Sequence, residues 1–109
     1  MGKRKWDKEF SSTLGEKARY RLRLDRKEKE ITDFVIQLEV EVDGKWKPIV
    51  RYDASHGYPH RDLYTADGKS KDAVDTTYDP DLGYANVAST AQDDIRKNWV
   101  RYCEGFEDE

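Results

Sequence analysis

Residues 34–44 read Phe34-Val35-Ile36-Gln37-Leu38-Glu39-Val40-Glu41-Val42-Asp43-Gly44. Apolar side chains stand at every second position, which is the pattern of a strand with one buried face and one wet face. The Asp-Gly pair at the end is a strong signal for a tight hairpin turn. The stretch therefore predicts a long β-strand that turns back into a second strand over residues 45–53.

The returning strand can be set against the first in two registers. A two-residue turn would pair Val42 with Lys45 and Glu41 with Trp46, which mixes apolar and polar faces. A three-residue turn with Gly44 in the left-handed conformation pairs Glu41 with Lys45 instead, so that opposite charges meet across the strands. We therefore expect the three-residue turn.

This register has consequences further along the hairpin. It puts Tyr52 opposite Phe34 on the dry face, together with Trp46, and leaves Arg51 and Asp53 on the wet face. Pro48 has no backbone N–H to give to a neighbouring strand, which predicts an edge position or a β-bulge there.

Strand patterns also flank the hairpin. Residues 18–25 alternate between apolar side chains and a row of three arginines, namely Arg19, Arg21 and Arg23. We expect this row to be a wet strand face paired with acids such as Glu39 and Glu41, and a track for a phosphate backbone is the alternative. Residues 60–65 resume the alternation, and a turn at Asp67-Gly68 leads to a short strand ending near Val74.

The C-terminal part of the chain predicts a helix. Ile95, Trp99, Tyr102, Cys103 and Phe106 form one apolar stripe at spacings of three and four residues. Ser89 or Thr90 is the expected N-cap, Asp93 and Asp94 suit the first turn, and residues 75–88 are expected to form a loop. Cys103 is expected to be a small core residue.

The expected architecture is thus α+β: an antiparallel, meander-like sheet of four or five strands with a C-terminal amphipathic helix packed on one face. Residues 17–109 form this single domain. The polar N-terminal segment, residues 1–16, carries Trp6, Phe10 and Leu14 at intervals of four, a spacing that suits a short helix.

Composition limits the classes of function. Residues 1–29 carry eleven Lys/Arg and five Asp/Glu, a net of +6, whereas residues 30–109 carry nine and eighteen, a net of −9. A basic front of this kind can steer a polyanion to one face. The single cysteine excludes an intrachain disulfide and suits the cytoplasm, and no apolar run approaches the length of a membrane-spanning helix.

The polar side chains that suit chemistry gather in residues 51–62. His56 and His60 are the two histidines of the protein, and together they suit acid–base cleavage of RNA that needs no metal. Asp53 is expected to orient an imidazole, while Arg51 and Arg61 are expected to bind phosphate. No cofactor is expected.

Two other interpretations of this stretch remain open. The His56-Gly-x-Pro-His60 loop can be purely structural, in a module that binds a protein or nucleic acid without catalysis. It can also form an open, labile site for a divalent metal from His56, His60 and Asp62, with Asp53 as another donor, although no metal ligand is assigned.

The pattern Val50-Arg51-Tyr52-Asp53-x-x-His56-Gly57-x-x-His60-x-Asp62, followed by Asp67-Gly68, resembles a family of small uncharacterised prokaryotic proteins. It is also similar to a segment of TumE-like toxin components of toxin–antitoxin pairs. The resemblance covers about residues 34–68, and Arg51, Asp53, His56 and His60 are the residues that correspond. It implies a small α+β domain with toxic RNA cleavage, and RNA and an antitoxin protein as partners. No membrane partner is expected, because the sequence has no long apolar run.

Overall fold

The computed structural model describes residues 5–54, 59–64, 70–75 and 83–107. Six strands and one helix follow each other in the chain: β1 (Lys8–Gly15), β2 (Ala18–Lys27), β3 (Glu30–Val42), β4 (Lys45–Asp53), β5 (His60–Tyr64), β6 (Ser70–Asp75) and α1 (Gly83–Glu107). The strands form one antiparallel sheet in the order β1-β2-β3-β4-β5-β6. The predicted α+β meander with a C-terminal helix is confirmed.

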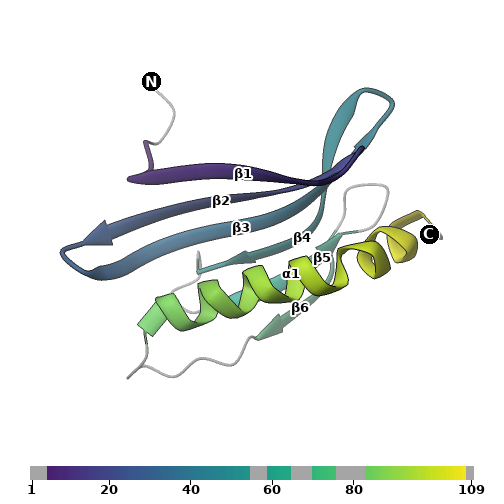
Figure 1. The fold of residues 1–109 in the computed structure, drawn as a ribbon. Coiled ribbons are helices and arrows are strands. Elements are labelled where there is room, and N and C mark those ends of the chain that lie inside the picture. The colour runs from purple at the N-terminus through teal and green to yellow at the C-terminus, as the bar shows by residue number, and fades with distance from the viewer. Residues whose placement is uncertain (1–4, 55–58, 65–69, 76–82, 108–109) are drawn as a thin grey trace.

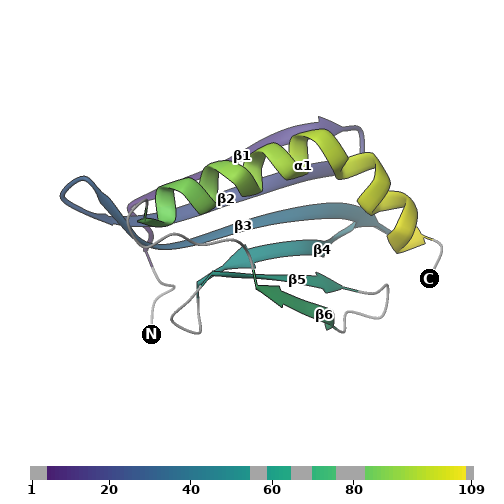
Figure 2. The same ribbon diagram turned by 90° about the horizontal axis from the view of Figure 1, so that it is seen from below.

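The helix lies across one face of the sheet, from the end with the β2–β3 turn to the end with the β3–β4 turn (Figures 1 and 2). Its apolar stripe and the inward positions of β2, β3 and β4 form one core cluster. Phe34, Ile36, Leu38, Val50 and Ile95 are fully buried in it. The predicted stripe on the helix is confirmed, and Cys103 packs against this core. The strand alternation thus buries one face under α1 and turns the intervening polar side chains to the other face.

The expected short helix in residues 1–16 is wrong, because residues 8–15 form β1. The segment Ser11-Ser12-Thr13 gives little apolar periodicity, yet β1 pairs along its whole length with β2. At its end the ring of Trp99 rests on the backbone of Gly15, where an added Cβ would come within 2.9 Å of the ring. Backbone pairing and this contact therefore stabilise β1 as an edge strand, although its sequence pattern does not predict a strand.

The helix begins earlier than expected. It starts at Gly83, whose φ is +71°, and the inward stripe continues backward through Ala91, Ala88 and Val87. Ser89 and Thr90 are therefore exposed positions inside the helix and not caps. Thr90 bonds back to the carbonyl of Asn86 at 3.0 Å, as hydroxyl side chains in helices often do. The part of the expected loop from residue 83 to 88 is helical.

The expected hairpin register is also wrong. Val42 pairs with Lys45, so the turn has two residues, Asp43 and Gly44, with φ of 54° and 79°. Positive φ at both central positions is the mark of the type I′ turn.

A β-bulge at Ile49 allows a two-residue turn while the second half of β4 keeps its apolar side chains on the buried face of the sheet. Glu39 pairs with Pro48 and Leu38 with Val50, which leaves Ile49 as the extra residue. The bulge predicted near Pro48 is thereby confirmed. Because of it, residues in the first half of β4 point to the face opposite to the one that the expected register gave them. Trp46 consequently pairs with Glu41 on the uncovered face, and Tyr52 pairs with Ile36 instead of Phe34.

The turn expected at Asp67-Gly68 lies outside the described residues, as do residues 76–82 of the expected loop. No helix in the described part of the chain combines the length and the apolar character needed to cross a membrane.

Candidate functional site

The face of the sheet opposite α1 carries the polar side chains that alternate with the core residues, and we call it the open face. The open face includes the side chains of Arg19, Arg21, Arg23, Gln37, Glu39, Trp46, Arg51, Asp53, His60 and Asp62. They come from β2, β3, β4 and β5, so four neighbouring strands contribute to one surface.

Asp53, His60 and Asp62 meet at the β4–β5 end of the open face. Asp53 lies directly opposite His60 in the register, and Asp62 follows His60 by two residues on the same side of β5. The Nε2 atom of His60 lies 3.0 Å from Oδ1 of Asp53 and 3.5 Å from Oδ2 of Asp62. Two carboxylates therefore face one ring nitrogen.

This cluster is buried although α1 lies on the opposite face of the sheet. The side chains of His60 and Asp53 are 5% and 7% exposed, and that of Asp62 is 19% exposed. Charged groups are seldom buried unless they are paired or bind a cation. The Nε of Arg51 lies 3.8 Å from Asp53 and adds one positive charge at the rim.

The structure unites some of the predicted site residues and separates others. Arg51, Asp53 and His60 lie together on the open face, as expected. Arg61 points to the other face, where its Nη1 donates to the hydroxyl of Tyr102 at 3.2 Å. Neighbouring strand positions face opposite ways, so Arg61 cannot share a ligand with His60. His56 lies outside the described residues.

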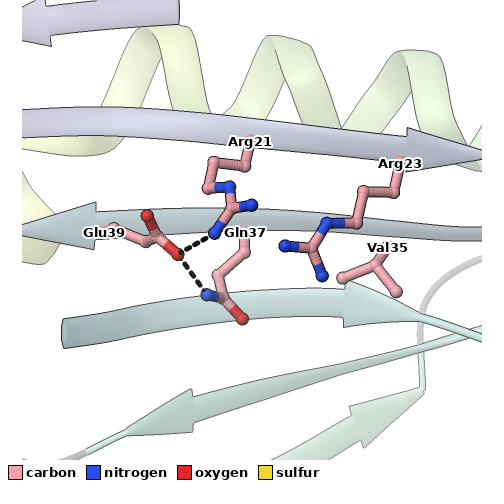
Figure 3. A pocket seen from close by; sticks show the side chains of 5 residues that line it. All are labelled: Arg21, Arg23, Val35, Gln37 and Glu39. Carbon is pink, nitrogen blue, oxygen red and sulfur yellow. Dashed lines mark hydrogen bonds and ion pairs between the residues drawn. The ribbon is translucent and has the colours of Figure 1, made fainter. Parts of the chain in front are cut away.

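The arginine row lies at the other side of the open face, and acids hold it in place. Arg19 donates from Nε to Glu39 at 2.7 Å, and Nη1 of Arg21 lies 3.8 Å from the same carboxylate. Glu39 also accepts a hydrogen bond from Gln37 (Figure 3). Arg23 pairs with Glu9 of β1 at 3.4 Å. The expected pairing with Glu39 is thus confirmed.

Trp46 completes this part of the surface. The guanidinium of Arg19 lies 4.0 Å from the centre of the Trp46 ring, a cation–π arrangement. The contact exists because the bulge at Ile49 turns Trp46 to the open face.

Two hollows border the arginine row. Arg21, Arg23, Val35, Gln37 and Glu39 line the one drawn in Figure 3, where the guanidinium of Arg23 lies over Val35. The other, of about 150 Å³, lies toward the edge strand and is lined by Glu9, Phe10, Ser11, Arg21, Leu22 and Arg23. Both are lined by Arg21 and Arg23, so these two side chains stand beside space that a ligand can enter.

Sequence reasoning missed a polar network under the helix. The carboxylate of Asp94 accepts hydrogen bonds from the hydroxyls of Tyr52 and Tyr102 and from the amide of Asn98. Tyr102 in turn accepts from Arg61. The positions Asp94, Asn98 and Tyr102 are spaced by four, which is the one signal in the sequence that could have revealed the network.

This network shifts the pKa of its members. Burial raises the pKa of Tyr52, and its hydrogen bond to Asp94 raises it further. The pKa of Tyr102 is raised by the same two causes. Burial would raise the pKa of Asp94, but the hydrogen bonds from Tyr102, Tyr52 and Asn98 outweigh it and lower the pKa. The network therefore favours a charged aspartate between neutral tyrosines.

Comparison with known proteins identifies a family but no activity. No curated protein and no solved structure matches the chain. A family model described as "Domain of unknown function (DUF7718)" matches residues 3–109. The expectation of an uncharacterised family is confirmed to that extent, and the likeness to TumE-like toxins is not part of the finding. The chain belongs to the DUF7718 family.

Proposed function

We propose that this protein binds RNA on the open face, with Arg21, Arg23 and Arg51 as phosphate contacts. The observation that carries the proposal is the placement of these side chains. They project from the sheet face that α1 leaves uncovered, and each side chain is between 31% and 39% exposed. Arginine is the side chain best suited to bind phosphate with two parallel hydrogen bonds.

The ion pairs of these arginines leave room for a phosphate. Glu9 approaches Arg23 at Nε, and Asp53 approaches Arg51 at Nε. A guanidinium has five N–H donors, so a carboxylate at Nε leaves donors on the terminal nitrogens. Glu39 approaches Arg21 at the terminal nitrogen Nη1, but at 3.8 Å this contact is too long for a hydrogen bond. The three ion pairs therefore leave N–H donors of each guanidinium for a phosphate.

The spacing along the strand also suits a polynucleotide. Arg21 and Arg23 are two residues apart on one strand, which separates their Cα atoms by about 6.6 Å. Successive phosphates of an extended single strand are separated by a similar length. The hollow of about 150 Å³ beside Arg21 and Arg23 offers space next to the row for part of a nucleotide. Single-stranded RNA is the form whose phosphates and bases a sheet surface can contact together.

Fluorescence anisotropy with a labelled single-stranded RNA tests this proposal. The double variant Arg21→Gln/Arg23→Gln is expected to weaken binding and to reduce the slope of log Kd against log salt by about 1.4, or ~0.7 for each lost phosphate contact. Lys97→Gln/Arg101→Gln removes the same charge from exposed positions on α1 and is expected to leave the slope unchanged. Equal losses in the two double variants would mean that net charge, and not the open face, governs binding.

A second candidate function is cleavage of the bound RNA, in the manner of a toxin. The contact of 3.0 Å between Asp53 and His60 favours it, because a carboxylate that holds an imidazole fixes its tautomer. In this mechanism His60 and His56 serve as base and acid, and Arg51 holds the phosphate. Arg61, which faces α1, is left out of the phosphate site. An antitoxin protein would then be the natural partner.

Cleavage is measured by gel electrophoresis of labelled RNA in the presence of a chelator. Loss of cleavage in both His56→Ala and His60→Ala, with binding retained, is the expected result. An RNA that stays intact with the wild-type protein would exclude the mechanism.

The burial of His60 favours a third interpretation, a binding module without catalysis in which His60 is structural. Under that interpretation His60→Ala lowers the melting temperature while partner binding survives.

A further inference from the structure

We propose that Asp53, His60 and Asp62 form a binding site for one divalent transition-metal ion, with Zn²⁺ as the best-suited ion. The proposal goes beyond RNA binding and concerns different side chains. Its ligand set consists of one imidazole nitrogen and two carboxylate oxygens, all from the β4–β5 pair. Of the residues that the sequence offered for a metal, His60, Asp62 and Asp53 come together, and His56 lies outside the described residues.

The donor atoms are close enough to share one ion. All three lie within 4.8 Å of one another. Zinc binds nitrogen and oxygen ligands at about 2.0–2.1 Å, so two ligands of a tetrahedral ion are about 3.3 Å apart. The distances from His60 Nε2 to the two carboxylates, 3.0 and 3.5 Å, lie on either side of this value. Asp62 is the most exposed of the three side chains, so its carboxylate can rotate to bring an oxygen to coordinating distance from the same ion.

Proton count also favours a cation at this point. Two carboxylates converge on a single ring nitrogen, and that nitrogen carries at most one proton. Its N–H can point at Asp53 or at Asp62 but not well at both. A divalent ion at the same place interacts with both carboxylates at once and balances two negative charges in a buried setting.

The strand scaffold makes the site rigid. Asp53 and His60 are direct cross-strand partners, and Asp62 is held two residues along the same strand. Ligands on paired strands keep their spacing without a cation, as a preformed metal site requires.

A metal at this site and cleavage by His60 exclude each other. In the cleavage mechanism Asp53 accepts the Nε2 proton of His60, and Nδ1 is the basic nitrogen. An ion bound at Nε2 leaves the single ring proton on Nδ1, which then has no lone pair with which to act as a base. RNA binding through Arg21 and Arg23 does not depend on this nitrogen. Failure of the metal site would therefore leave the RNA-binding proposal untouched, and the reverse also holds.

Calorimetric titration of ZnCl₂ into tag-free protein, stripped with a chelator, measures the site directly. One equivalent is expected to bind, with an affinity at least about tenfold weaker in Asp62→Asn, because even the loss of an outer-shell partner costs 10–100-fold. Asp93→Asn, at a side chain 59% exposed on α1, is the control and is expected to bind as the wild type does. Cys103→Ser is also expected to bind normally. Absence of stoichiometric binding would overturn the proposal.

Two-dimensional ¹H–¹⁵N spectra of the imidazoles add a test that needs no loss of function. The protein has two histidines, so His56→Ala assigns the signals of His60. Zn²⁺ is expected to shift Nε2 of His60 at one equivalent, in the wild type and in His56→Ala alike. A shift confined to His56, or none in either ring, would show that the cluster is a hydrogen-bonded pair without a metal.

Discussion

Gly15 lies where β1 ends against α1, and the ring of Trp99 rests on its backbone. A Cβ at this position would lie 2.9 Å from one ring carbon and 3.4 Å from the next. Real Cβ atoms do not come this close, so either the ring or the strand must move. The absence of a side chain at one residue therefore lets the edge strand and the helix touch.

We predict that Gly15→Ala lowers the free energy of unfolding by about 1–3 kcal/mol through overpacking. Gly105→Ala is the matched control, because an added Cβ there meets nothing within 4 Å and the residue is helical. It is expected to raise stability by about 0.5–1 kcal/mol. Urea unfolding of the two variants checks both signs. A stable Gly15→Ala protein would mean that Trp99 has another position.

The network around Asp94 predicts how stability depends on pH. The pKa of Tyr52 is raised on folding by burial and by its bond to Asp94. Above pH ~10 the unfolded chain loses this proton first, so the contribution of Tyr52 falls as pH rises. The pKa of Asp94 is lowered, so its contribution is present above pH ~4 and is lost as pH falls further.

We predict that Tyr52→Phe is less stable than the wild type by about 1.5–3 kcal/mol at pH 7, the usual range for a hydrogen bond to a charged group. This difference should shrink above pH 10, where the wild type alone loses the contribution. Urea unfolding between pH 7 and 11 measures it, with Tyr64→Phe as the control outside the network. A difference that stays constant over this range would contradict the assignment.

At the scale of elements, α1 is held by its inward stripe. Ile95 is 0% exposed, whereas Val100 on the outer side is 51% exposed. We predict that Ile95→Ala costs about 2–5 kcal/mol, because it leaves a cavity between helix and sheet. Val100→Ala changes stability by less than about 0.5 kcal/mol. Thermal unfolding followed by circular dichroism compares them, and similar losses in both would argue against the packing described.

Strands β2, β3, β4 and β5 could be predicted because period two marks a sheet that is buried on one face. Strand β1 could not, since it is a polar edge strand that its partner and Trp99 hold in place. The helix start was missed because Tyr84, Val87 and Ala88 lie in a segment rich in turn residues. The register was missed because a bulge changes which face the following residues point to, and the pairing argument did not apply the bulge signalled by Pro48 to the rest of β4.

The candidate site could be predicted in part for the same physical reason. Alternation along β5 places His60 and Asp62 on one face, and this follows from the sequence. The position of Asp53 opposite His60 depends on the β4–β5 register. The orientation of Nε2 and the burial of the cluster depend on tertiary packing. Asp94 was taken for a charge at a helix end, because the earlier start of α1 was not foreseen.

At the scale of the whole molecule, one core cluster joins β2, β3, β4 and α1. A domain of this size with a single core is expected to unfold in one step. Tryptophan fluorescence and far-ultraviolet circular dichroism are therefore predicted to give coincident urea transitions. Two separated midpoints would mean that the β5–β6 part of the sheet melts independently of the core.

The order β1-β2-β3-β4-β5-β6 also bears on how fast the chain can find its fold. Every strand of the described sheet pairs with its neighbour in the chain, so each pairing closes a short loop and loses little chain entropy. The docking of α1 on β3 joins segments that are far apart in the sequence, so it costs more chain entropy than the pairing of consecutive strands. In stopped-flow experiments we expect refolding faster than that of Greek-key domains of similar length, and slowed most by substitutions in the α1 stripe if helix docking limits the rate.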